Sequence, residues 1–145
     1  MASLPMPNAP VVHPRGLTIG EAARHLGVAP ATIRYYENEG LTLSRPDRDG
    51  RNRRRYFEGD MAWLAGLTML RGSGMTIRQM REYVDLYRSS DDLHELLALL
   101  EKHREEAALR LRAVHGHVEA LDRKIQGYRE QLSLDTRGVP EAESP

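Results

Sequence analysis

The spacing of hydrophobic and polar residues first predicts two short helices in the N-terminal half of the chain. Thr18 can cap a helix whose Glu21 reaches back to it, in the Thr-x-x-Glu capping-box arrangement, and that helix should end near Gly27. Pro30 suits the first turn of a second helix, which Gly40 should stop. Two short helices separated by about four residues predict a helix-turn-helix.

A short polar hairpin and two further helices follow. Strand-like alternation occurs only around residues 43–57, where Asp49-Gly50 supplies a turn signal. This pattern predicts an exposed β-hairpin, which we call the wing. A third helix should cover residues 58–71, and a Thr-x-x-Gln capping box at residue 76 should open a fourth helix that lasts to about residue 87.

The last helix has the strongest periodicity in the chain. Apolar residues recur at alternating steps of four and three from Leu93, and only Arg104 interrupts the series. A repeat sustained over several heptads specifies a left-handed coiled coil with a partner helix. The alternative is a helix packed on its own domain, but about 40 residues extend about 60 Å and overrun a small head. The predicted dimer interface comprises Leu93, Leu97, Leu100, Ala107, Leu111, Val114, Val118, Leu121, Ile125 and Tyr128.

The composition bounds the organisation of the protein. At 145 residues the chain suits one small domain with an extension. We expect a disordered arm at 1–15, a helix-turn-helix head at 16–88, a coiled-coil helix at 89–132 and a disordered tail at 133–145. No apolar run approaches the roughly 20 residues of a membrane span, and the N-terminus lacks the layout of a secretory signal. We therefore expect a cytoplasmic protein with no membrane partner.

The absence of cysteine excludes several classes of site. Disulfides, iron–sulfur clusters, thiolate metal sites and thiol redox switches all require that residue. The chain also lacks a phosphate-cradling glycine loop and an acid–base pair that periodicity would place in a cleft. We therefore expect neither an enzyme nor a resident cofactor or metal.

Charge is distributed unevenly although the net charge is zero. Residues 15–56 carry nine Lys or Arg against five Asp or Glu, whereas residues 91–132 carry seven against nine. The wing alone holds six arginines, and such crowded like charges repel unless a polyanion neutralises them. A solvated charge run is the alternative. The six are Arg45, Arg48, Arg51, Arg53, Arg54 and Arg55.

The second predicted helix has a face suited to the major groove. Its core-facing positions are Val28, Ile33 and Tyr36. That assignment turns a short, polar and aromatic set outward, which can anchor phosphates and reach base edges. The alternative is that Arg34 and Glu37 merely solvate a surface helix. The outward set comprises Ala31, Thr32, Arg34, Tyr35 and Asn38.

Three segments together carry a family resemblance, namely LTIGEAARHLGVAPATIRYYENEGL, RRRYF and LRGSGMTIRQMREYV. Over about residues 16–88 the chain resembles the MerR family of bacterial transcription regulators. The resemblance implies a mainly α fold, in which a winged helix-turn-helix head with a short β-hairpin precedes a long antiparallel coiled-coil dimerisation helix. It also implies a homodimer on an inverted-repeat operator in double-stranded promoter DNA. Such a dimer bends and untwists an overlong spacer so that RNA polymerase reaches both promoter elements.

The resemblance also assigns roles to residues. Thr32, Arg34 and Tyr35 would lie on the recognition helix, while Arg54 and Tyr56 would contact phosphates from the wing. Holding bent DNA needs many phosphate contacts, so the affinity should fall steeply with salt. The full predicted DNA-binding set is Thr18, Ala31, Thr32, Arg34, Tyr35, Arg45, Arg53, Arg54, Arg55 and Tyr56.

The sensed signal is less well defined. The layout is most similar to the aldehyde- and stress-responsive branch, whose reactive thiol position is occupied here by Met69, so thiol alkylation is excluded. Histidine-only metal sensing is disfavoured because His115 and His117 point away from each other on a helix. A site for a small apolar effector is predicted where the head meets the coiled coil, although its residues could simply be core. These residues are Trp63, Met69, Tyr83 and Tyr87.

Two alternative functions remain at this point. A ligand-independent architectural DNA-bending protein would keep the head but show no effector response. A purely structural coiled-coil protein would explain residues 91–132 but not the wing. The sequence predicts neither the operator nor whether the protein activates or represses.

Overall fold

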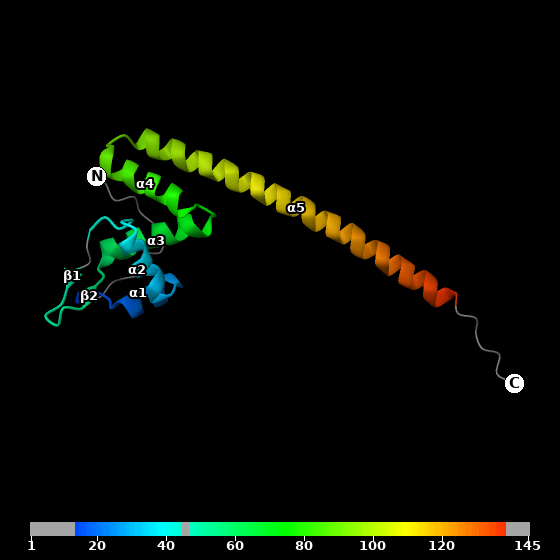
Figure 1. The fold of residues 1–145 in the computed structure, drawn as a ribbon, viewed down its shortest axis with the longest axis horizontal. Helices are drawn as coiled ribbons and strands as arrows, with labels where there is room; N and C mark the ends of the chain where they lie inside the picture. The colour runs from blue at the N-terminus through cyan, green and yellow to red at the C-terminus, as the bar shows by residue number, and fades with distance from the viewer. Residues whose placement is uncertain (1–13, 45–46, 139–145) are drawn as a thin grey trace. The chain divides into compact units, whose positions relative to one another are not determined.

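The computed structural model describes residues 14–44 and 47–138. Its regular elements are helices and one two-stranded hairpin (Figure 1). This confirms the predicted mainly α fold with a short wing. Most of the predicted disordered arm, and most of the predicted tail, lie outside the described residues. The elements are α1 (Ile19–Leu26), α2 (Pro30–Asn38), β1 (Asp47–Arg48), β2 (Arg54–Arg55), α3 (Glu58–Gly72), α4 (Ile77–Ser89) and α5 (Leu93–Arg137).

Both predicted capping boxes are present. The Thr18 hydroxyl accepts from the Glu21 N–H at 3.2 Å, and the Thr18 N–H donates to the Glu21 carboxylate at 2.8 Å. Thr76 and Gln79 make the same reciprocal pair at the start of α4, at 3.2 and 2.9 Å. These bonds satisfy N–H groups that have no partner inside the helix, which fixes where each helix begins.

Two helices of the head end in the same way. Gly27 and Gly40 have φ angles of 67° and 72°, a left-handed conformation that favours glycine. The N–H of the following residue then bonds back into the helix, as when Leu41 N donates to Tyr36 O at 3.0 Å. Leu41 is thereby turned into the core, where it is fully buried.

The chain divides into two compact units between His103 and Arg104, and we call the first unit the head. The head defined in this way includes the start of α5, beyond residue 88. The reason is that Leu96 is buried and that Leu99 and Leu100 pack against the core. The core comprises Ala22, Ala23, Ile33, Tyr36, Leu41, Tyr56, Met61, Leu64, Leu67, Leu70, Met75, Met80 and Val84.

The second unit consists, in its described part, of the remainder of α5. The predicted seam is exposed along it, with Leu111 at 71% and Tyr128 at 58% of full exposure. The helix does not stop at residue 132 but continues to Arg137. In this last part of the helix, the hydroxyls of Ser133 and Thr136 donate to carbonyl oxygens four residues earlier, at 3.0 and 2.6 Å. Within the described residues, no helix is both long and apolar enough to cross a membrane.

Candidate nucleic-acid interface

Helix α2 presents the predicted recognition face. Ile33 is fully buried and Tyr36 nearly so, and they fix the orientation of the helix on the core. Ala31, Arg34 and Tyr35 are exposed as predicted, while Thr32 is half-buried at the edge of this face. A short helix with one buried stripe therefore turns a guanidinium and a phenol toward solvent.

The wing is anchored to the start of α1 by a backbone bridge that the sequence did not predict. Its strands pair antiparallel, with Arg48 opposite Arg54. Beyond β2, Tyr56 and Leu17 exchange two backbone hydrogen bonds of 2.7 and 2.9 Å. This bridge places the α1 cap at Thr18 beside the wing.

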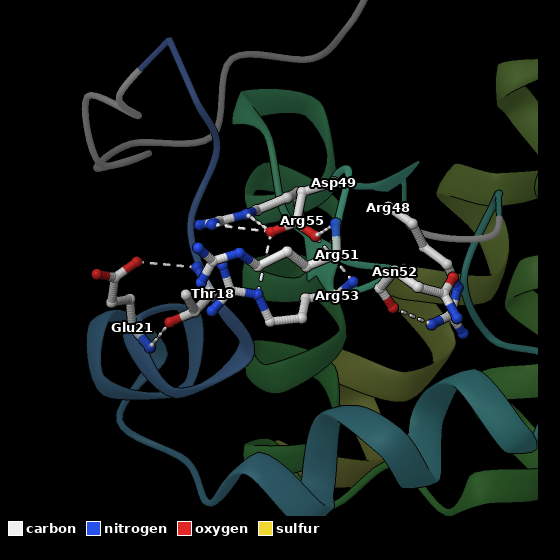
Figure 2. A network of polar contacts seen from close by, with 8 residues as sticks. All are labelled: Thr18, Glu21, Arg48, Asp49, Arg51, Asn52, Arg53 and Arg55. Atoms are coloured by element: carbon white, nitrogen blue, oxygen red, sulfur yellow. Dashed lines mark hydrogen bonds and ion pairs between the residues drawn. The ribbon is translucent and has the colours of Figure 1, made fainter.

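The turn of the wing is built around the carboxylate of Asp49 (Figure 2). Its Oδ1 accepts from the backbone N–H groups of Arg51 and Arg53, at 2.9 and 3.0 Å. The positive φ of the turn, 60°, falls on Asn52 rather than on Gly50 of the predicted turn signal. Asparagine tolerates this conformation better than most residues do.

The same carboxylate also pairs with two wing arginines. Its Oδ2 lies 3.1 Å from Arg53 Nε and 3.1 Å from Arg55 Nη2. These contacts lower the pKa of Asp49 to about 2, first through the backbone hydrogen bond from Arg53, then through those from Arg51 and the Arg55 side chain. Asp49 therefore holds the wing arginines in place and neutralises part of their charge.

A second carboxylate, that of Glu37, joins the recognition helix to the wing. Its Oε1 accepts from the Tyr56 hydroxyl at 2.5 Å, and its Oε2 lies 2.5 Å from Arg54 Nη1. The Glu37 side chain is only 7% exposed. Burial, followed by the hydrogen bond and the charge of Glu37, raises the pKa of Tyr56.

These contacts revise the role expected for Tyr56. The residue is 2% exposed and its hydroxyl is bound to Glu37, so this structure places it inside the head rather than at a phosphate. For Glu37 the sequence suggested no role beyond the alternative that it solvates a surface helix. The signal that could have identified it is its helical spacing, because it follows buried Ile33 by four residues and adjoins buried Tyr36.

Four of the predicted DNA-binding residues meet around one hollow. This hollow has a volume of about 420 Å³ and lies between the start of α1, the recognition helix and the wing. It gathers Thr18, Arg34, Arg53 and Arg54, while Arg45 lies outside the described residues. The complete lining is Thr18, Ile19, Arg34, Arg48, Asn52, Arg53 and Arg54.

Three of the four predicted effector-site residues form an aromatic cluster. The Trp63 ring centroid lies 4.8 Å from that of Tyr87 and 6.1 Å from that of Tyr83. Burial raises the pKa of Tyr83, with a smaller contribution from Tyr87. Met69 is 53% exposed on α3. No group of three or more His, Asp or Glu side chains in the described ranges could hold a metal ion.

The recognition helix, the basic wing and the hollow between them define a winged helix-turn-helix DNA-binding protein. The family model for MerR HTH family regulatory proteins matches residues 17–86. An uncharacterized HTH-type transcriptional regulator of Pseudomonas aeruginosa is 37% identical over 112 residues, which cover 76% of this chain and 73% of that protein. Another from Haemophilus influenzae is 27% identical over 118 residues, covering 81% and 87%.

A solved structure extends the similarity to three dimensions. HiNmlR, a MerR family regulator lacking the sensor domain and bound to promoter DNA, is 26% identical with a TM-score of 0.69. The match covers 81% of this chain and 94% of HiNmlR. The chain belongs to the MerR family and is a DNA-binding transcription regulator, not an enzyme. The family resemblance and the expectation of a non-enzymatic protein are thus confirmed.

Proposed function

We propose that the protein acts as a homodimer that binds an inverted-repeat promoter operator and bends and untwists it to control transcription. The observation that carries this proposal is the basic hollow between α2 and the wing. It has the position and charge to receive a phosphate while Arg34 and Tyr35 lie on the exposed face of the recognition helix.

The roles within this interface follow from exposure and charge. Arg34 and Tyr35 reach base edges in the major groove, where arginine can pair with guanine through two hydrogen bonds. Arg48 and Arg53 contact phosphates from the wing, and Thr18 adds a contact from the α1 cap. Arg53 also pairs with Asp49 but keeps 55% of its side chain exposed, whereas Arg54 and Arg55 are 29% and 21% exposed beside their carboxylate partners and mainly shape the wing.

The exposed seam of α5 supports dimerisation. Large apolar side chains are about half exposed or more at Leu111, Val114, Val118, Leu121 and Ile125. A periodic apolar stripe of this kind is stabilised when a second helix covers it. An antiparallel pair of α5 helices would join two heads, which suits the two half-sites of an inverted repeat.

An effector remains part of the proposal. A small apolar molecule near Trp63, Tyr83 and Tyr87 would meet partly buried aromatic rings on α3 and α4. Its binding would change how the DNA-bound dimer presents the promoter to RNA polymerase. An architectural DNA-bending protein would lack this response.

The test is DNase I footprinting of the DNA upstream of the gene, with and without RNA polymerase. We expect a protected inverted repeat between the promoter elements, with enhanced cleavage at its centre where the duplex is distorted. Protection without sequence preference would support the architectural alternative. If the wild-type protein protects no sequence there, selection from a randomised duplex pool decides whether it has an operator at all.

A further inference from the structure

Four consecutive residues follow the recognition helix on the way to the wing. Side chains from other helices of the head contact each of them. We call residues 39–42 the connector. It begins at the C-terminal cap of α2 and leads toward β1. The connector continues directly from the recognition helix, and the chain runs on through residues 43–46 to β1, so a shift of the connector moves the C-terminal end of that helix.

Helix α4 holds the connector through two arginines. Arg88 Nη2 donates to the carbonyl oxygens of Gly40 and Thr42, at 3.1 and 2.5 Å. About two turns earlier on the same helix, Arg81 forms an ion pair with Glu39. Arginine side chains at this position donate hydrogen bonds to carbonyl oxygens beyond the end of α2. Their positive charge also interacts favourably with the negative, C-terminal end of the α2 dipole.

Helix α3 supplies the remaining contact. Trp63 Nε1 donates to the carbonyl oxygen of Leu41 at 2.8 Å. The same indole packs against Tyr83 and Tyr87 of α4. The connector is therefore tied to a surface that α3 and α4 share, and not only to its neighbours in sequence.

We propose that Arg88 is a positioning residue for DNA recognition. Together with Arg81 and Trp63 it fixes the connector, and through the connector it fixes where the C-terminal end of the recognition helix lies. The inference rests on the proposed function. It adds a route by which a displacement of α4, or of the aromatic cluster, reaches the surface that reads the operator.

The test compares three variants of the full-length protein. Arg88→Ala removes both hydrogen bonds, Arg88→Lys keeps a charged donor, and Arg78→Ala removes a charge from the same helix at a residue that pairs with Glu82 of that helix. Operator duplex is obtained by selection from a randomised pool with the wild-type protein. The dissociation constants for this duplex and for a scrambled duplex are then measured where each variant is fully folded.

We expect Arg88→Ala to lower the ratio of operator to scrambled affinity about three- to tenfold, as suits exposed charge-assisted hydrogen bonds. Arg88→Lys should recover part of the loss, and Arg78→Ala should match the wild type. An equal loss on both duplexes would identify Arg88 as a phosphate contact and overturn the proposal. So would a ratio unchanged in all three variants.

Amide hydrogen exchange separates this inference from the proposed function. In the free protein, Arg88→Ala should speed exchange of the Leu41 amide, which bonds to Tyr36 O, relative to Arg78→Ala. Wild-type protein that selects no operator would reject the proposed function. Unchanged exchange at Leu41 would reject the connector's dependence on Arg88, whatever the DNA result.

Discussion

Replacing Tyr56 with phenylalanine separates a structural role from a DNA contact. The substitution removes one hydroxyl and keeps the ring in the core. In the structure that hydroxyl donates to the nearly buried carboxylate of Glu37 at 2.5 Å. Tyr56→Phe therefore leaves one oxygen of a charged group without its donor.

The expected loss of stability can be estimated from this contact. A hydrogen bond to a charged group contributes about 1.5–3 kcal/mol, and Glu37 keeps Arg54 as a partner, so we expect a loss of about 2 kcal/mol. Chemical denaturation measures it at one fixed protomer concentration, so that any contribution of the proposed dimer to stability stays constant. Combined with Glu37→Gln, the effect should be clearly non-additive.

Tyr35→Phe is the matched control, since Tyr35 is 45% exposed on the recognition helix. It should leave stability unchanged and weaken operator binding, whereas Tyr56→Phe should do the reverse. A Tyr56→Phe protein as stable as the wild type, yet impaired on DNA, would refute the reasoning and return Tyr56 to the phosphate backbone.

The pKa of Tyr56 adds a pH test of the same contact. The folded protein keeps this proton above pH 10, where the unfolded chain begins to lose it, because the pKa is raised from 10.0. The contribution to stability is therefore full below pH 10 and declines as pH rises further. In Tyr56→Phe the decline above pH 10 should be shallower.

The remaining predictions concern the wing, the seam and the recognition helix. The ionised Asp49 carboxylate stabilises the wing fully above its ordinary pKa of 3.8, and this stabilisation is lost as pH falls toward about 2. Asp49→Asn should therefore remove the acid dependence of the wing structure, which an amide NMR titration of the wing residues measures. Leu121→Ala should raise the dimer dissociation constant about 30-fold or more, while Leu109→Ala, outside the seam, should change it little in sedimentation equilibrium. Arg34→Ala should cost about 1–3 kcal/mol of operator discrimination with a smaller effect on scrambled duplex; an equal loss on both would contradict a base contact.

Sequence reasoning succeeded where local chemistry decides the structure. The capping boxes at Thr18 and Thr76, and the left-handed ends at Gly27 and Gly40, depend on residues three or four positions apart. Their helices were therefore predicted closely. The outward face of α2 also followed, because helical spacing alone separates Ile33 from its exposed neighbours.

It failed where a residue finds its partner far along the chain. Glu37 meets Tyr56 and Arg54 only after the wing folds back onto α2. The connector contact of Arg88 spans a still larger separation. The seam pattern, read as one continuous interface, likewise gave no sign that Leu100 would pack against the head core.

The two carboxylates that pair with wing arginines, Asp49 in the wing and Glu37 on α2, bear on how the protein discriminates between DNA sites. Asp49 and Glu37 already pair with Arg53, Arg54 and Arg55 and neutralise part of their charge. Each such arginine must give up an internal partner to meet a phosphate, so arbitrary duplex gains less from it than from a free guanidinium. A genome offers about 10⁶–10⁹ competing sites, and weaker retention at each would leave more of the protein free to search. We expect the carboxylates beside the wing arginines to shorten the time that the protein spends on non-specific DNA.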